Sequence, residues 1–311
     1  MTIYTDTFGD IDAPSSGLKD NLDEVFMDEF IGENFEFEQV FKVEEMTELV
    51  RNESKIQYPV RSRTVSEGGS FHRVEMQQVR TKQYVMEFIK TEMKITREAM
   101  KYQKFQELKD GAKALAQVMH TTIEELAQSV FLLGFTTLQT PDGVSLFNTL
   151  HPIFDADAGY PTTQSNRSNL KLNPTNLKLR RTALRKHRNE KGALSKARAD
   201  RLICGPDQEF NAQHCMQDGY EPFSANLTSN IAGQGLGGKP IVLSYIADSD
   251  YPDSWFLQDS KRHMLKFFWG QKPKNWIDKD PNTADWLYRT EAHICFGASD
   301  YVGIDGNTGE V

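Results

Sequence analysis

The stretch DGVSLFNTLHPIF, residues 142–154, holds residue types that could carry acid–base or metal chemistry, because Asp155 and Asp157 follow closely on His151. A histidine beside carboxylates can act as a general base or bind a cation. A hard cation, however, needs about six oxygen ligands, more than two neighbouring aspartates supply. His151 also directly precedes Pro152, which disfavours a helical conformation for it. We therefore interpret His151 as a turn residue and predict no metal and no catalytic residue in this stretch.

The cysteines form a second candidate site. Cys204, His214 and Cys215 lack the paired spacing of a structural zinc site, so we interpret the two thiols as buried. With Cys295 the cysteines number three, which favours a reducing compartment over a disulfide framework. No metal site is predicted here either.

The glycine-rich stretch GQGLGGKP, residues 233–240, comes close to a nucleotide-binding P-loop. Pro240 takes the place of the Ser or Thr that would bind magnesium, and the stretch precedes a predicted strand instead of following one. We interpret it as a mobile glycine loop. The chain also has no G-x-S-x-G motif. The sequence therefore predicts no cofactor, no catalytic residue and a protein that is not an enzyme.

A basic segment is the remaining chemical signal. Residues 171–198 contain ten Lys or Arg and one acidic residue, Glu190. No aromatic residues interleave with these cations, which favours sequence-blind contact with phosphates or contact with acidic parts of neighbouring copies. The candidate residues for these contacts are Arg180, Arg181, Arg185, Lys186 and Arg188.

Charge is divided unevenly along the 311 residues, whose net charge is -8. Residues 1–50 hold 14 Asp or Glu against two Lys, a net charge of -12, and the remainder carries +4. An acidic head and a basic middle attract each other if copies assemble; the simpler interpretation is a solvated arm and a surface helix. No apolar run is long enough to cross a membrane, and the start lacks a secretory signal, so we expect a cytosolic protein without membrane contact.

The hydrophobic pattern predicts the elements that would position these residues. Apolar residues at steps of three and four predict a long helix from Thr96 to about Gly134. A second helix is predicted to open at Asn173-Pro174, a cap followed by a proline. Alternating apolar and polar residues predict a long strand over 286–296.

Two further segments need support from elsewhere. Residues 54–95 predict an extended hairpin with its turn at Gly68-Gly69. An isolated two-stranded hairpin is marginal in water, so we expect this one to rest on another subunit. Residues 18–50 predict an acidic amphipathic arm whose apolar face is too small to be stable alone.

The segment DGVSLFNTLHP, residues 142–152, resembles the Gly-x-x-Leu-Phe-x-x-x-His-Pro segment of Mu-like phage major head subunits. The surrounding chain resembles tailed-phage capsid proteins in the same order. QYVMEFIKTEMKITREAM resembles the strand that enters their spine helix, and ADRLICGPDQEFNAQ resembles their strand–proline–helix step. AHICFGASDYVGIDGN is similar to their closing segment.

The resemblance implies the Hong Kong 97-type phage capsid fold, an α+β fold that encapsulin shells share. His151 would then be a structural residue beside the spine helix. The implied parts are an acidic N-terminal arm (1–50), an E-loop hairpin (51–95), a peripheral domain with the spine helix and long β-strands (96–195, completed by the strand at 284–311) and an axial domain (196–279).

The implied function is that of a major capsid protein, a virion component that assembles in the host cytoplasm. Its copies would form the hexamers and pentamers of an icosahedral head around double-stranded DNA, which they contact non-specifically. A scaffolding protein and a portal are the other implied partners. The candidate self-assembly residues are Phe26, Phe30, Phe35, Arg61, Arg63, Phe71 and Arg73.

Three alternatives stay open at this point. The first is an encapsulin-like cellular shell protein with a protein cargo. The second is a nucleic-acid-binding protein that uses the basic helix 174–191. The third is an uncharacterised hydrolase.

Overall fold

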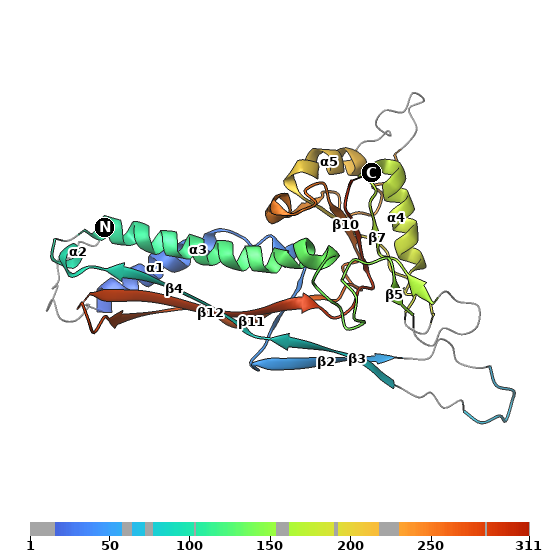
Figure 1. Ribbon diagram of the computed structural model, residues 1–311, viewed down its shortest axis with the longest axis horizontal. Coiled ribbons are helices and arrows are strands. Elements are labelled where there is room, and N and C mark those ends of the chain that lie inside the picture. Colours follow the sequence, from blue (N-terminus) through green and yellow to red (C-terminus); the bar gives the residue numbers. More distant parts are fainter. Residues whose placement is uncertain are drawn as a thin grey trace.

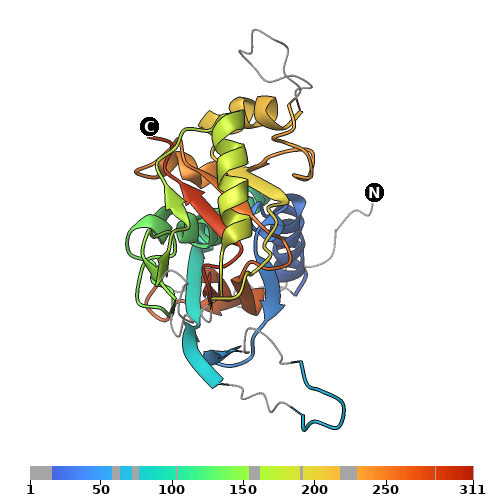
Figure 2. The ribbon, with the colours of Figure 1, turned by 90° about the vertical axis from the view of Figure 1, so that its right-hand side faces the viewer.

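The computed structural model describes residues 16–57, 64–71, 77–102, 104–153, 162–189, 192–217, 230–283 and 285–310. The molecule is elongated, with a long sheet covered by helices, a small lobe at one end and a projecting hairpin (Figure 1). Seen along its length, the small lobe and the hairpin extend in opposite directions (Figure 2).

The long sheet has four strands in the order β1-β11-β12-β4. β1 runs parallel to β11, and the other neighbours are antiparallel. Along β12 the predicted alternation is confirmed, because Tyr288, Ala292 and Ile294 are buried while Arg289 and Glu291 are half-buried. The strands are β1 (Lys42–Glu45), β4 (Glu87–Ile95), β11 (Leu265–Lys279) and β12 (Trp286–Ala298).

The long helix α3 (Phe105–Leu132) lies along one face of this sheet (Figure 1). It is shorter than expected, because the short helix α2 (Arg97–Lys101) precedes it separately. Thr96 caps α2, since its Oγ1 accepts a hydrogen bond from the Ala99 amide at 3.2 Å. The buried side of α3 follows helical spacing and includes Leu108, Ala112, Leu115, Met119 and Ile123.

The acidic arm folds back onto its own subunit. Helix α1 (Ser16–Gly32) packs against α3 and buries Leu22, Phe26 and Phe30 at steps of four residues. After it come the 3-10 turn η1 (Phe37–Gln39) and β1. The apolar face predicted to be too small alone is thus completed by α3.

The small lobe is a five-stranded sheet in the order β7-β13-β10-β8-β9. Helix α4 (Pro174–Lys186) covers it and begins as predicted, with the Asn173 side chain accepting from the Asn176 amide. A strand was expected to begin at Ile241 after the glycine-rich stretch. It is only two residues long, and the 3-10 turn η4 follows it. The elements are β7 (Arg167–Ser168), β8 (Arg201–Cys204), η3 (Pro206–Gln208), α5 (Glu209–Gln217), β9 (Ile241–Val242), η4 (Ser244–Asp248), β10 (Trp255–Gln258) and β13 (Ile304–Asn307).

The hairpin is shorter than expected. Its strands β2 (Val50–Gln57) and β3 (Gln77–Val85) pair only with each other. The next strand, β4, was expected to belong to the hairpin but pairs with β12. β11, which was expected in the axial domain, also lies in the long sheet. Both corrections have one cause: the long strand β12 needs a partner on each side. β11 pairs with it from Trp286 to Ala298, and β4 pairs with it from Trp286 to Ile294.

The remaining elements connect the two sheets. They are the 3-10 turn η2 (Leu133–Phe135), which follows α3, and the two-residue strands β5 (His151–Pro152) and β6 (Thr163–Gln164), which pair with each other. The other boundaries proposed for the domains remain a prediction.

Candidate assembly surfaces

His151 lies fully buried in the turn that follows α3. Its Nδ1 is 2.6 Å from Asp142 Oδ2, and its Nε2 is 2.9 Å from Asn166 Oδ1. The ring stacks on Tyr301, with 3.7 Å between the ring centroids. Every polar atom of the imidazole thus faces an oxygen of the protein, which favours the interpretation of a structural residue. Asp155 and Asp157 lie outside the described residues.

Asp142 is the centre of this network, and the sequence did not single it out. Burial raises the pKa of its carboxyl, but hydrogen bonds from His151 and Thr140 outweigh that effect and hold the pKa below the usual value. Arg80 of the hairpin approaches Asp142 as well, with 3.7 Å between Nη1 and Oδ2. The network therefore joins the turn to the hairpin. The prolines and glycines near Asp142 indicated a turn here. The contact with Tyr301 could not be predicted, because Tyr301 is distant in sequence.

The base of the hairpin is fastened to its own subunit by further contacts. Tyr84 and Ser299 share a hydrogen bond of 2.6 Å between their hydroxyl oxygens. Lys82 Nζ donates to the Gln139 carbonyl at 3.1 Å, and Lys55 forms an ion pair with Asp300. The segment 64–71 is exposed throughout. The base is therefore anchored, and the outer segment is free to meet another molecule.

The candidate assembly residues divide into three groups. Phe26, Phe30 and Phe35 are buried within the subunit; Phe30 stacks on Phe26 at 6.0 Å and meets Phe35 edge-on at 5.6 Å between ring centroids. Phe71, in contrast, is fully exposed. Arg61, Arg63 and Arg73 lie outside the described residues.

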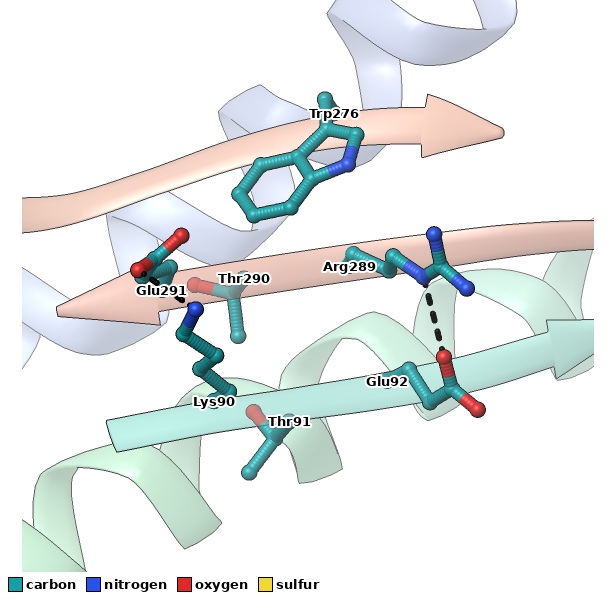
Figure 3. A pocket seen from close by; sticks show the side chains of 7 residues that line it. All are labelled: Lys90, Thr91, Glu92, Trp276, Arg289, Thr290 and Glu291. Carbon is teal, nitrogen blue, oxygen red and sulfur yellow. Dashed lines mark hydrogen bonds and ion pairs between the residues drawn. The ribbon is translucent and has the colours of Figure 1, made fainter. Parts of the chain in front are cut away.

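The face of the long sheet opposite α1 and α3 carries a shallow hollow of about 450 Å³ (Figure 3). Two ion pairs between neighbouring strands flank it, Lys90 with Glu291 at 3.1 Å and Arg289 with Glu92 at 3.0 Å. The Trp276 ring lies beside both pairs (Figure 3). This face thus offers an aromatic ring within a frame of fixed charges, a combination typical of protein–protein contact surfaces.

The cations of α4 have different environments. Arg180 is buried and holds the Asp305 carboxylate with both arms of its guanidinium, at 2.9 and 2.5 Å, so it stabilises the lobe internally. Arg181 donates to the carbonyls of Ala232 and Gln234. The candidate contacts that stay exposed are Arg185 and Lys186, whereas Arg188 is half-buried and donates to Gly192.

A second carboxylate network joins the arm, α3 and the small lobe. Glu124 accepts from the amides of Glu36 and Phe37 at 3.2 and 3.0 Å and from Gln128 Nε2 at 2.7 Å. The same Gln128 amide group donates to Glu36 at 2.9 Å, and Glu36 also accepts from the Ser244 amide. Burial is the main reason that the pKa of Glu124 rises to about 7. The sequence contained one indication of this network, because Glu124 and Gln128 are polar residues on the otherwise apolar side of α3.

The described residues include no cluster of three or more His, Cys, Asp or Glu suited to a metal ion. Cys204, Cys215 and Cys295 are all buried, and burial raises the pKa of the Cys204 thiol to about 12. The glycine-rich stretch forms turns and opens no helix. None of the described helices is both long and apolar enough to cross a membrane.

Comparison with known proteins places this geometry in a family. A family model described as "Phage capsid protein" matches residues 90–304. No curated protein matches the sequence. Among solved structures, the procapsid of bacteriophage JBD30 superimposes with a TM-score of 0.53 at 14% identity over 95% of this chain and 75% of the other.

Two further structures share the fold. A virus-like particle from Pyrococcus furiosus has a TM-score of 0.54 at 11% identity, over 93% of this chain and 98% of the other. The capsid of Ralstonia phage GP4 has a TM-score of 0.53 at 11% identity, over 86% of each chain.

Proposed function

The chain belongs to the phage capsid protein family and is a major capsid protein of an icosahedral shell, and we propose that its copies form hexamers and pentamers around double-stranded DNA. The family match over residues 90–304 carries this conclusion. It includes α3, the strands β11 and β12 with most of β4 from the long sheet, and the small lobe up to the start of β13. A protein with this role is structural, and we propose that it has no catalytic activity.

The contact that we propose between neighbouring copies uses the hairpin. Within the part of the chain that the structure describes, its two strands pair only with each other, and Phe71 in its outer segment is fully exposed. The open face of the long sheet presents Trp276 between two ion pairs (Figure 3). Burying one phenylalanine there would contribute about 1.5 to 3 kcal/mol per contact. Repeated around a ring, such contacts favour closed assemblies over free subunits.

The other partners follow from the same role. We propose that a scaffolding protein and a portal assist assembly in the host cytoplasm, and that the finished subunit resides in the virion. The exposed cation Lys186 is a candidate for non-specific contact with packaged DNA, and the exposed cation Arg185 is a candidate for contact with a neighbouring copy. The Leu146-Phe147 and His151-Pro152 pairs support assignment to the Mu-like type of head subunit.

Electron microscopy and sedimentation of the purified chain test the proposal. The wild-type protein should form rings or closed shells, and deletion of residues 60–79 should leave a folded subunit that forms neither. Phe71→Ala should lower the yield of shells, whereas Leu150→Ala, which removes another exposed apolar side chain, should not. Normal shells from the deletion variant would contradict the hairpin contact, and a wild-type protein that never assembles would contradict the function itself.

An encapsulin-like shell is the second candidate, favoured by the likeness to the Pyrococcus furiosus particle. The two candidates differ in their contents. Shells that retain DNA support the capsid assignment, and shells that retain a defined protein in fixed ratio support the alternative.

A further inference from the structure

The small lobe carries opposite charges on two of its sides. One side, the basic flank, consists of Arg181 and Arg185 on α4 with Lys196 and Arg198 on the extended segment that follows. A hollow of about 450 Å³ lies on it, lined by Arg185, Lys196, Ala197 and Arg198. The cations thus surround a space that a group from another molecule can enter.

The charge of the basic flank is not neutralised within the described part of the subunit. Arg185, Lys196 and Arg198 form no ion pair with any residue that the structure describes. Burial, and then the charges of Arg185 and Arg198, lower the pKa of Arg181, so these guanidinium groups lie close enough to repel. Lys196 has a φ of 56°, the only positive value among described residues other than glycine. Such a conformation is costly and persists where the surroundings require it.

The acidic flank lies elsewhere on the same lobe and consists of Asp207, Asp248, Asp250 and Asp253, all exposed. Gln208 joins its two parts, because its Nε2 donates to Asp253 Oδ1 at 2.6 Å. Within the described residues none of the four aspartates forms an ion pair. The flank is therefore a coherent surface of uncompensated negative charge.

The two flanks cannot meet inside one subunit. Helix α4 packs beside β13, near the β7 edge of the sheet, whereas η4 directly follows β9 at the other edge. Figure 1 shows α4 and the η3–η4 region on opposite sides of the lobe. Complementary surfaces on opposite sides of one body are the requirement for a head-to-tail contact, which closes into a ring when the rotation between copies permits it.

We propose that the basic flank of one copy binds the acidic flank of the next, so that the small lobes form a charge-complementary ring. The inference rests on the proposed function, because it assumes that copies assemble. A phosphate backbone could also neutralise the basic flank, but it gives no role to the four unpaired aspartates. A second copy accounts for both surfaces at once.

Charge reversal on each side tests the contact in the full chain. The basic-flank variant combines Arg185→Glu, Lys196→Glu and Arg198→Glu, which turns the flank from +4 to -2, and the acidic-flank variant combines Asp207→Arg, Asp248→Arg and Asp250→Arg, which turns its flank from -4 to +2. Each should lower the yield of rings and shells about tenfold at low salt, a change that corresponds to about 1.4 kcal/mol. The chain with all six substitutions should recover the yield, because its flanks carry -2 and +2 and are complementary again. Lys109→Glu with Lys113→Glu reverses two exposed cations on α3 instead and should assemble normally.

Mixing the two variants gives a sharper result. One variant then has two negative flanks and the other has two positive flanks, so alternating copies are complementary at every contact. An even ring of six can alternate throughout, whereas a ring of five leaves one contact between like charges. The mixture should therefore form six-membered rings and lack five-membered ones.

Each outcome decides the proposal. Recovery in the sixfold variant, with six-membered rings from the mixture, supports it. Folded reversal variants that assemble like the wild type overturn it while leaving the shell function intact. Loss of bound DNA in the basic-flank variant, with assembly unchanged, assigns the flank to phosphates and also overturns it. A wild-type chain that forms no assembly refutes the proposed function instead.

Discussion

Phe147 packs at the junction between α3 and the small lobe. It is fully buried, and its ring lies 4.8 Å from Phe135 and 5.0 Å from Phe256 between centroids. A Cβ atom on Gly134 or Gly306 would lie 2.7 or 2.5 Å from this ring, so both glycines leave room for it. Phe147→Ala should lower the free energy of unfolding by about 3 to 5 kcal/mol. Urea denaturation measures this, with exposed Phe71→Ala as the control; a loss below about 1 kcal/mol would show that the site collapses freely.

Glu124 should make stability depend on pH. Its pKa is about 7 in the folded subunit and 4.5 ordinarily, so its contribution is fully present below pH 4.5 and is lost as pH rises through 7. The difference is on the order of 3 kcal/mol. Glu124→Gln removes this titration. Relative to the wild type, the variant should therefore become more stable by up to that amount between pH 5 and pH 8.

The control for this prediction is Glu125→Gln, because Glu125 is exposed on the same helix. Burial lowers the pKa of His187 and of His263 to about 4, so stability is also lost as pH falls from 6.5 through 4. That loss is common to variant and wild type and cancels in their difference. Equal pH profiles for Glu124→Gln and the wild type would contradict the prediction.

At the scale of residues, the sequence indicated the local role of a side chain better than it indicated which side chains it contacts. The interpretation of His151 as a structural turn residue came from Pro152 and the glycines, which are its neighbours in sequence, and the contacts of the buried ring favour it. The contacts of His151 with Asn166 and Tyr301 join distant parts of the chain and leave no periodic pattern. Phe26, Phe30 and Phe35 were predicted to lie at assembly contacts, but apolar residues in a sequence do not tell whether their own subunit or a neighbour covers them.

At the scale of elements, α1 depends on α3 for its helical structure. Its exposed side repeats acidic residues at Asp20, Glu24 and Asp28, and like charges four residues apart disfavour an isolated helix. Burial of Phe26 against α3 compensates for this cost. Phe26→Ala should speed amide hydrogen exchange throughout residues 16–32 while α3 remains protected, whereas Ile31→Ala, at an exposed position, should not. Unchanged exchange in α1 would show that the helix forms independently.

The predictions of elements succeeded where a pattern is long. The spine helix α3, the cap of α4 and the strand β12 each repeat their period often enough to be recognised. The hairpin boundary failed because residues 77–95 read as one extended segment, although β3 and β4 belong to different sheets. Met86 lies between the two strands, and the change of partner there depends on β12, which is distant in sequence.

At the scale of the whole molecule, the two lobes in Figure 1 share one hydrophobic core. Phe256 of β10 packs into the same cluster as Phe131 of α3, with 5.0 Å between the ring centroids. Its neighbours Trp255 and Leu257 face the other side, in the cluster that α4 completes. A four-residue strand buried on both sides has no alternating pattern, so the sequence did not indicate that β10 joins the two clusters.

The last prediction follows from this shared core. Because β10 contributes to both clusters, the lobes cannot unfold independently without exposing one of its faces. Amides in α3 and α4 should therefore exchange with the same free energy, and Phe256→Ala should lower both values by the same amount, about 3 to 5 kcal/mol. Leu179→Ala, at an exposed position on α4, should lower neither. Hydrogen exchange followed by mass spectrometry measures both helices in one experiment. If α4 exchanged at a lower free energy that Phe256→Ala left unchanged, the small lobe would be an independent unit and the core would not couple it to the long sheet.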